Sequence, residues 1–417
     1  MGKHIYPVAA ILLATLIFLT GNGLLGTVTP VRAHLEGFSD LAIGFMGSAY
    51  YAGFFAGCFA GPRLLARVGH SRTFAVAAGL AAATAVTQPL IVNEVVWTLI
   101  RASIGFSAAN LYMVIESWLN DRATNETRGR IFSSYLTVNY TGLIIGQALL
   151  IAGGAKSFSL FNLSAVFYAL CLIPMGLTRL PQPAPTPVPK LRPARLFAVA
   201  PVGVMGCIAV GLANGAVWTL APVYAQDHDF NRGLLAAFMC AFALGGALVQ
   251  VPVGRLSDHM DRRIVIVVVA LLAAAAGLLL GYFGGTHVTR TLVLVTIFGM
   301  TALPCYGLAV AHTNDRLPRD AFVEASATLL LVNSLASVAG PVLAALVTAR
   351  AGTQALFYYT ATIHIAFALY TLYRIRRMEP ATDEHRDLFT PMPQQASPTA
   401  LELDPRSPET PEDAAPA

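Results

Sequence analysis

Long runs of apolar residues alternate with short polar stretches along almost the whole chain. Each run is about 20 residues long, the length that an α-helix needs to cross the hydrocarbon core of a bilayer. The period-two alternation of a barrel strand is absent, and helices satisfy their own backbone hydrogen bonds in lipid. The pattern therefore predicts an all-α membrane protein with twelve transmembrane helices, at residues 6–30, 41–62, 73–92, 96–118, 131–153, 160–178, 197–223, 233–254, 263–283, 291–312, 324–348 and 354–374.

The second half of the chain repeats the first. A shift of 192 residues places Asn22-Gly23 on Asn214-Gly215, and a shift of 194 places Asn120-Asp121-Arg122 on Asn314-Asp315-Arg316. These matches are informative because Asn, Asp and Arg are scarce in so apolar a chain, and they indicate an internal repeat. Six helices per repeat is an even number, so both halves enter the membrane in the same orientation, as a parallel repeat about the membrane normal.

The pattern divides the chain into four parts. Residues 1–178 and 197–378 are the two predicted six-helix bundles. Residues 179–196 between them contain closely spaced prolines, which forbid a helix and favour an extended cytoplasmic linker. Residues 379–417 are rich in Pro, Glu, Asp and Thr with few large apolar residues, so we expect a disordered acidic tail.

Composition and charge support this picture. The 417 residues are 56% hydrophobic and 12% charged, whereas a soluble domain carries about 25% charged residues. With both termini in the cytoplasm, 19 of the 27 Lys and Arg residues fall in the cytoplasmic termini and loops and five in the outer loops. The positive-inside rule therefore predicts cytoplasmic termini. This loop bias explains the basic membrane body, which gives no reason to expect a nucleic-acid partner.

Motifs for enzyme chemistry are absent. The sequence contains no His-Glu-x-x-His, no phosphate-binding glycine loop followed by Lys-Ser/Thr, and no Gly-x-Ser-x-Gly. The five cysteines lie in apolar runs without ligand spacing, as small buried hydrophobic residues do. We therefore expect no enzyme activity, no cofactor and no metal site.

Two loops at matching places in the halves carry the most specific motif. The string Gly254-Arg-Leu-Ser-Asp-His-Met-Asp-Arg-Arg263 follows the eighth run, and Pro62-Arg-Leu-Leu-Ala-Arg-Val-Gly69 follows the second. They resemble the signature Gly-x-Leu-Ala/Ser-Asp-Arg-x-Gly-Arg-Arg of the major facilitator superfamily. The second-half copy keeps Gly254, Leu256, Asp258, Arg262 and Arg263, and the first-half copy keeps Leu64, Arg67 and Gly69.

The resemblance covers residues 1–378 and implies two pseudo-symmetric six-helix bundles that rock around a midplane site. In that superfamily the loop aspartate holds the inner gate shut, which implies a gating role for Asp258. A carboxylate there can accept backbone amides at a helix start and pair with nearby arginines. Ala66 stands at the aspartate position of the first half, so we expect the second half to carry most of the locking. A solvated charge cluster is the alternative.

The fourth run contains two ionisable residues. Arg101 resembles an arginine signature that the superfamily associates with proton coupling; alternatively, it snorkels to the outer interface near Trp97. Glu116 lies 15 residues further on, about 22 Å along the axis, so the two do not pair directly. Glu116 either forms a structural ion pair with Arg128 or Arg130, or carries protons.

The string Glu116-Ser-Trp-Leu-Asn120 is similar to the YcaD-like bacterial branch of the superfamily, which implies the bacterial inner (plasma) membrane. In the second run, Gly53, Gly57 and Gly61 share one helix face. Small residues on one face let another helix approach closely. We expect this contact at the seam between the two halves.

The superfamily's geometry implies a substrate cavity lined by the first, second, fourth and fifth helices of each half. Polar candidates there are Asn22, Asn139, Asn214, Asn333, Trp218 and His312. Asn22 and Asn214, like Asn139 and Asn333, are related by the repeat. Interhelical hydrogen bonds would satisfy these amides as well as a ligand would, so both interpretations stay open.

These features predict a secondary active transporter that moves a small organic solute by alternating access. No nucleotide-binding motif is present, so the energy is expected to come from an ion gradient, with protons as the expected coupling ion. Few fixed charges fall among the cavity candidates, so a neutral or weakly polar solute is expected. We expect the lipid bilayer and the solute as partners and a monomer as the working unit. A transport-inactive membrane sensor or scaffold with the same fold is the alternative.

Overall fold

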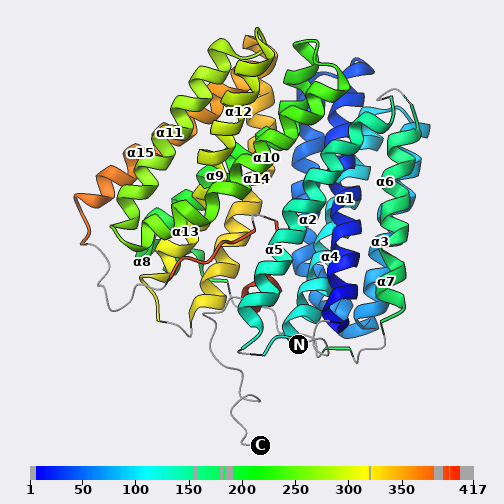
Figure 1. Cartoon of the computed structure of the whole chain (residues 1–417), viewed down its shortest axis with the longest axis horizontal. Coiled ribbons are helices and arrows are strands. Elements are labelled where there is room, and N and C mark those ends of the chain that lie inside the picture. Colours follow the sequence, from blue (N-terminus) through cyan, green and yellow to red (C-terminus); the bar gives the residue numbers. More distant parts are fainter. Residues whose placement is uncertain are drawn as a thin grey trace, which may run out of the picture.

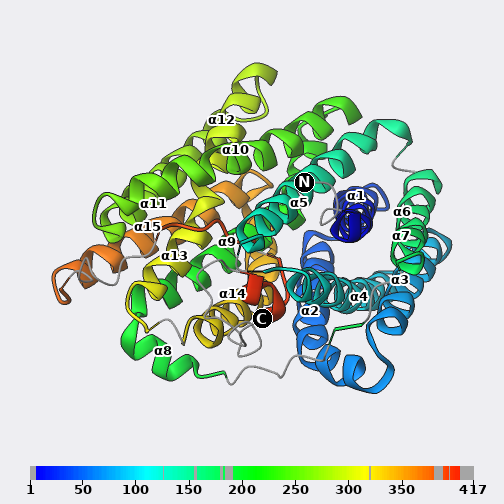
Figure 2. The ribbon, with the colours of Figure 1, turned by 60° about the horizontal axis from the view of Figure 1, so that its bottom comes forward.

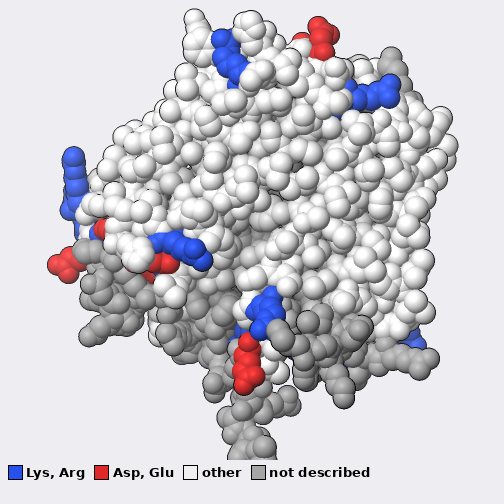
Figure 3. Space-filling model, in the orientation of Figure 1, with Lys and Arg blue, Asp and Glu red and all other residues white. Residues whose placement is uncertain are grey.

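The computed structural model describes residues 6–124, 126–154, 157–178, 182–183, 191–318, 321–379, 388–393 and 395–403. Regular secondary structure in these residues is helical, and twelve helical segments among them are long and apolar enough to cross a membrane. The prediction of twelve transmembrane helices is confirmed, and the protein is an integral multi-pass membrane protein. On the side shown in Figure 3, charged side chains gather towards the ends of the molecule and leave an uncharged band between them.

The helices form two bundles that stand side by side (Figure 1). The first bundle consists of α1 (Tyr6–Leu35), α2 (Asp40–Val68), α3 (His70–Thr87) with η1 (Gln88–Leu90), α4 (Glu94–Asp121), α5 (Arg128–Ala148) with η2 (Leu149–Ala152), and α6 (Ser159–Leu170) with α7 (Leu172–Gly176). The second consists of α9 (Pro201–Asp227), α10 (Arg232–Asp258), α11 (Arg262–Phe283), α12 (Val288–Ala302) with α13 (Pro304–Asn314), α14 (Phe322–Ala351) and α15 (Ala355–Ile375).

The two ends of the bundles are called here the linker face and the opposite face. The linker face carries the α2–α3 connection, the α10–α11 connection and the short helix α8 (Pro193–Val199), and lies at the bottom of Figure 1. The opposite face carries the α1–α2 and α9–α10 connections. At the opposite face, Ser39 caps α2 by accepting Ala42 N at 3.2 Å, and Asn231 caps α10 by accepting Leu234 N at 2.9 Å. Each cap satisfies a backbone N–H that has no partner within its helix.

Glycines bring the second and fourth spans of each bundle into backbone contact. A Cβ at Gly53 of α2 would collide with the carbonyl oxygen of Ala102 in α4, and a Cβ at Gly245 of α10 would lie too close to the carbonyl oxygen of Thr296 in α12. Gly57 likewise faces Phe106 of α4. The prediction that this glycine face lies at the seam between the halves is wrong, because the face packs within the first bundle.

Proline breaks the tenth span, whereas its repeat partner α4 is continuous. The helix is interrupted at Leu303, just before Pro304. A proline inside a helix lacks the N–H for the ladder and crowds the preceding turn. The interruption places Leu303 in the wall of the central cavity.

The bundles touch each other directly towards the opposite face. His34 at the end of α1 pairs with Asp227 at the end of α9, with 2.9 Å between Nε2 and Oδ1. In the same region α2 packs against α14: a Cβ at Gly44 would lie 2.6 Å from the Cβ of Ala345. These contacts join the two bundles at this face.

Towards the linker face, a stretch of the chain's C-terminal region lies between the bundles. Residues 388–393 and 395–403, called here the C-terminal segment, include η5 (Pro398–Leu403), which contacts α4, α5 and α14. Figure 2 shows this segment in red where the bundles part. Composition predicts a disordered tail from residue 379, but the side chains of Met392, Ala396 and Ala400 are buried in this crevice. These apolar side chains gain from burial although the surrounding sequence is polar. Residues 380–387, 394 and 404–417 lie outside the described residues.

The structure differs from the predicted extended linker at the end of that linker. Residues 193–196, which we expected to be extended, form the start of α8. Pro193 stands at the first position of that helix, where its missing N–H costs nothing. Residues 179–181 and 184–190 of the predicted linker lie outside the described residues.

Candidate functional site

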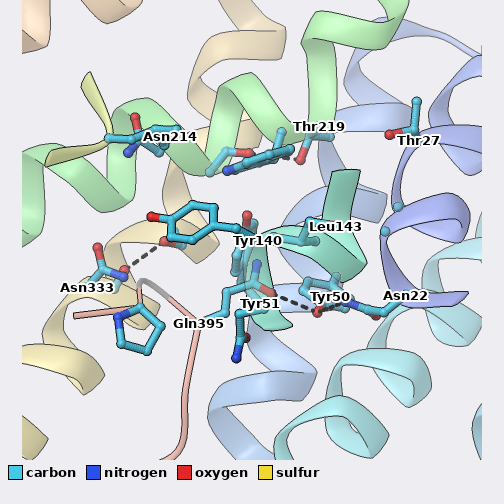
Figure 4. Close-up of a pocket in the computed structure, with 18 of the residues that line it drawn as sticks. Asn22, Thr27, Tyr50, Tyr51, Tyr140, Leu143, Asn214, Thr219, Asn333 and Gln395 are labelled. Atoms are coloured by element: carbon cyan, nitrogen blue, oxygen red, sulfur yellow. Dashed lines mark hydrogen bonds between the residues drawn. The ribbon is translucent and has the colours of Figure 1, made fainter. Parts of the chain in front are cut away.

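A cavity of about 1150 Å³, including open solvent at its mouth, lies between the two bundles. Figure 4 shows side chains from both bundles around it, with Asn22, Thr27 and Tyr50 on one side and Asn214 and Asn333 on the other. Its described lining residues include Asn22, Thr27, Tyr50, Tyr51, Arg101, Tyr112, Asn139, Tyr140, Gln147, Asn214, Trp218, Thr219, Asn333, Ser337, Pro393 and Gln395. The cavity is thus walled by both halves of the repeat and floored by the C-terminal segment.

Side chains of the first bundle form a hydrogen-bonded wall. Asn22 of α1 donates to the hydroxyl of Tyr50 at 3.4 Å and accepts from the hydroxyl of Tyr168 at 3.1 Å. Gln147 of α5 accepts from Thr27 at 2.7 Å. These bonds fix the direction of the amides, so the wall is preorganised.

Arg101 of α4 stands in this wall. Its side chain is 8% exposed, and its guanidinium lies over the ring of Tyr50 at 4.6 Å from the centroid. The residue therefore faces the cavity, and the interpretation that it snorkels to the outer interface does not describe its position. An arginine at the centre of a membrane helix costs about 2.5–3.5 kcal/mol on insertion scales, and a desolvated cation–π contact returns about 2 kcal/mol.

The second bundle presents polar groups without partners. Neither polar atom of the Asn214 side chain has a hydrogen-bond partner, and Oδ1 of Asn333 has none. Both residues line the cavity and are buried. Trp218 lies beside them and meets Phe242 edge-on at 5.1 Å. A buried amide without a partner is costly, so these groups mark a place where a ligand or water belongs.

Two other cavity candidates are placed differently from each other. Asn139 of α5 lines the cavity and donates to the backbone oxygen of Tyr135 at 2.8 Å. His312, by contrast, is near the linker-face end of α13 and faces the charged groups of Arg316, Arg263 and Asp261. His312 is not among the described lining residues of the cavity. The pattern misplaced it because a residue two positions before the end of its span lies well below the midplane.

Glu116 is fully buried in the interior of the first bundle. Its Oε1 accepts from the hydroxyl of Tyr135 at 2.5 Å, and its Oε2 accepts from the backbone N–H of Ser397 at 2.8 Å. The expected ion pair with Arg128 or Arg130 is replaced by these two bonds. One of them comes from the C-terminal segment, which no pattern in the sequence places next to α4.

The α10–α11 connection carries a network of buried ion pairs. Arg262 pairs with Asp258 at 2.9 Å and with Asp315 at 2.6 Å, and it also donates to Ser257 at 2.9 Å. Asp258 is the last residue of α10 and accepts the backbone N–H of Phe389 at 2.9 and 3.1 Å. The network joins the linker-face ends of three second-bundle helices, α10, α11 and α13.

The amide that we expected Asp258 to accept at a helix start is accepted by Asp261 instead. Asp261 caps α11 by accepting Arg263 N at 3.0 Å, and its carboxylate pairs with the Arg263 guanidinium at 2.7 Å. Partial burial alone would raise the pKa of Asp261, but the hydrogen bonds and charge of Arg263 hold that pKa below its usual 3.8. Gly254 packs under the Phe389 ring, and Leu256 is exposed.

At the matching α2–α3 connection, the hydrogen bonds of His70 join uncharged groups. Gly69 ends α2 with a positive φ of 83°, which glycine adopts without steric cost. His70 follows it and shares a hydrogen bond of 2.9 Å between its Nε2 and the hydroxyl of Ser117. The His70 N–H donates to Gln182 at 2.9 Å. Leu64 is half-buried and Arg67 is exposed.

Several lining residues were not among the sequence candidates. Tyr51 and Thr219 escaped notice because aromatic and hydroxyl residues are common in apolar helices and carry no spacing signal. Pro393 and Gln395 were missed because the tail was expected to be disordered. One available signal was the cluster of large apolar residues Leu388, Phe389 and Met392 inside an otherwise polar stretch. In the residues that the structure describes, no group of three His, Cys, Asp or Glu side chains could hold a metal ion.

Known proteins share both the sequence pattern and the fold. The family profile described as Major Facilitator Superfamily matches residues 11–242 and 204–405. The "Uncharacterized MFS-type transporter YcaD" of Escherichia coli (strain K12) is 26% identical over 380 residues, which are 89% of this chain and 97% of the relative. The protein of the same name in Escherichia fergusonii is 26% identical over 387 residues, covering 90% and 98%.

Two solved structures extend the comparison. The nucleoside transporter NupG is 12% identical with a TM-score of 0.73, over 88% of this chain and 98% of that one. A D-xylose-proton symporter is 15% identical with a TM-score of 0.71, over 88% and 97%. At these identities the likeness shows the fold.

Proposed function

Because the chain belongs to the major facilitator superfamily, we propose that it is a secondary active transporter that moves a small organic solute across the membrane by alternating access. The observation that supports this most directly is the cavity between the bundles, whose wall combines residues from both halves of the repeat. A site shared in this way changes its exposure when one bundle rocks against the other.

Alternating access needs two packings of the same bundles. In the packing described, the His34–Asp227 pair and the α2–α14 contact hold the bundles together at the opposite face, which supports a packing closed on that side. In the second packing that we propose, these contacts are broken and the linker face is closed. The bonds of Arg262 to Asp258 and Asp315 hold the ends of α10, α11 and α13 together, so these helices move as one body.

The linker face is assigned to the cytoplasm of a bacterial inner membrane. The Lys and Arg bias of the loops favours this orientation under the positive-inside rule. Both termini then lie in the cytoplasm, and the working unit is a monomer, because one chain supplies both walls of the cavity.

Protons are the proposed coupling ion. Glu116 is a carboxyl group inside α4 that accepts hydrogen bonds on both oxygens, and Arg101 lies in the cavity wall on the same helix. A proton on either oxygen of Glu116 competes with the donor already there. Proton binding therefore changes how α4 is tied to Tyr135 and to the C-terminal segment.

A thermal-shift screen of the purified chain against a metabolite and drug library, followed by flux of each stabilising compound in vesicles, tests this function. We expect an imposed pH gradient to accelerate flux. Asp258→Asn should slow flux about tenfold, because it weakens the ion pair with Arg262 that lets α10 and α11 move as one body. Asp229→Asn, in the exposed α9–α10 connection, is the matched control and should keep the native rate.

A membrane sensor or scaffold is the alternative function, favoured by Ala66 at the aspartate position of the α2–α3 connection. Such a protein would bind compounds in the thermal-shift screen but move none of them under any gradient. Flux that ignores the pH gradient would retain transport and remove the proton-coupling proposal. Native flux in Asp258→Asn would remove the gate role.

A further inference from the structure

The position of Arg101 bears on which solute the cavity accepts. Among the described lining residues it carries the only fixed charge. Its described contact is the face of the Tyr50 ring, which attracts a cation but does not neutralise its charge. The arginines at the linker face differ, since Arg262 pairs with two aspartates and Arg263 with one. A guanidinium in this setting is a fork of donors suited to a carboxylate.

The opposite wall supplies groups that complement such a ligand. The Asn214 amide and Oδ1 of Asn333 are buried without partners, and both belong to the second bundle. Trp218 lines the cavity beside them. A molecule that reaches from Arg101 to these residues would satisfy the free polar atoms and place its body against an aromatic surface.

We infer that the solute is an organic monoanion whose carboxylate binds Arg101 and whose ring or apolar body lies against Trp218 and the cavity tyrosines. The inference rests on the proposed function and narrows it to one substrate class. It revises the expectation of a neutral or weakly polar solute, which was based on the few fixed charges among the cavity candidates.

Matched carboxylate and amide probes test the charge directly. The probes are benzoate with benzamide, cinnamate with cinnamamide, and indole-3-acetate with indole-3-acetamide. Binding to the purified full-length chain is measured by thermal shift and by tryptophan fluorescence in a Trp97→Phe/Trp118→Phe background, which leaves Trp218 as the reporter. We expect at least one carboxylate to bind about tenfold or more tightly than its amide. Arg101→Gln should remove that preference, whereas Arg350→Gln, at an exposed position, should keep it.

The outcomes separate this inference from the proposed function. If no carboxylate binds better than its amide, or if Arg101→Gln keeps the preference, the substrate class is wrong. If a preferred carboxylate binds but never enters vesicles, the anion site stands and transport falls. If amides are transported without any carboxylate preference, the proposed transport function is supported and the proposed carboxylate site is wrong.

The C-terminal segment carries a second inference from independent observations. It touches both bundles: the Phe389 N–H donates to Asp258 of α10, and the Ser397 N–H donates to Glu116 of α4. Gln395 accepts from the Tyr50 hydroxyl at 3.3 Å, and the Met392 carbonyl accepts from Gln250 at 3.2 Å. The Phe389 ring fills a space that a Cβ at Gly254 would occupy.

These contacts lie on the path between the cavity and the linker face. Pro393 and Gln395 form part of the cavity wall, and η5 lies against α4, α5 and α14. A solute that leaves towards the linker face must displace the segment. The segment also engages both Asp258 and Glu116, the proposed gate and coupling residues.

We propose that the C-terminal segment is an autoinhibitory plug that closes the linker-face mouth of the cavity until it is released. The test uses a cysteine reporter, Leu136→Cys, in the cavity wall, with the five native cysteines replaced by alanine. Its labelling by a charged maleimide is measured from the linker-face side. Phe389→Asp in the full-length chain sets a carboxylate against Asp258 and removes the ring from its site.

We expect Phe389→Asp to raise the labelling rate about tenfold or more, because burial of the ring and the amide bond are both lost. Leu388→Asp, whose side chain is 78% exposed, is the matched control and should label at the native rate. A chain ending at Glu379 should label at least as fast as Phe389→Asp, and a synthetic peptide of residues 388–403 should slow it again. Equal labelling of the native chain, Phe389→Asp and the shortened chain would overturn the plug.

Discussion

The two bundles solve the same packing problem with glycines, yet they fasten their linker-face loops with different chemistry. In the first bundle Gly53 meets the α4 backbone, and in the second Gly245 meets the α12 backbone. The α10–α11 connection then adds ion pairs around Arg262. At the corresponding place in the first bundle, His70 shares a neutral hydrogen bond with Ser117.

The comparison shows that the fold requires glycine at the helix crossings but allows different polar groups in the loops. Two helices can cross at backbone distance only if the residue at the crossing has no side chain, so both halves keep glycine there. A loop at a helix end has several ways to satisfy its polar groups. Among the described residues, the ion pairs around Arg262 and Arg263 therefore belong to one loop, while the repeat is kept in the interior.

The largest expected difference concerns the two loops themselves. Arg262→Ala leaves the carboxylates of Asp258 and Asp315, which are 9% and 4% exposed, without their shared cation. Removing one partner of a buried ion pair costs about 3–5 kcal/mol. His70→Ala removes one neutral hydrogen bond and should cost about 1 kcal/mol. Thermal unfolding of the purified variants measures the loss of stability in each. Equal losses in Arg262→Ala and His70→Ala would show that the two loops stabilise the fold to the same extent.

The glycine crossings should behave alike. Gly53→Leu and Gly245→Leu each force a side chain into a neighbouring backbone, and overpacking of this kind costs about 1–3 kcal/mol or more. Gly79→Leu is the control, because a Cβ there meets nothing within 4 Å. Size-exclusion profiles and unfolding temperatures report the result. If Gly53→Leu folds like the Gly79→Leu control while Gly245→Leu does not, the two glycine crossings are not equivalent.

The smallest expected effect depends on pH. The pKa of Asp261 is lowered in the folded protein despite the opposing effect of burial, because Arg263 donates to it and carries the opposite charge. A carboxyl group of this kind stabilises the fold above its unfolded pKa, and the contribution is lost as pH falls through the folded pKa. Asp261→Asn should therefore cost about 1 kcal/mol at neutral pH, since the group is partly exposed and screened.

The same cost should shrink as the buffer is taken below pH 3.8, the ordinary pKa of an aspartate. Unfolding temperatures of the native and variant chains at neutral and acidic pH give the comparison. Gly69 occupies the matching first-half position, so no equivalent acid sensitivity is expected there. A stability gap that stays constant across this pH range would show that ionisation of Asp261 does not stabilise the fold.

Much of the fold follows from the sequence because its signals are local. The twelve apolar runs and the repeated Asn, Asp and Arg positions predict the helices and their two-bundle arrangement. Four cavity asparagines, Asn22, Asn139, Asn214 and Asn333, were also found from the repeat, and the structure places all four in the cavity wall.

The remaining features depend on contacts between distant segments. The partner of Gly53 could be any helix that approaches closely, and spacing alone does not distinguish α4 from the other bundle. Glu116 was paired with nearby arginines because they are close in sequence, whereas its partners are Tyr135 and the C-terminal segment. The C-terminal segment was assigned from average composition, which hides a few apolar residues that find a crevice.

The hydrogen bonds described above between the C-terminal segment and the bundles come largely from the main chain of the segment. The amides of Phe389 and Ser397 donate, and the carbonyl of Met392 accepts. Main-chain groups are the same for nearly every residue type, so substitutions can accumulate in such a stretch while its docking persists. In relatives whose sequences no longer align in this region, the segment would then be recognised by two features. These are a C-terminal extension of similar length and one aromatic residue in the place of Phe389.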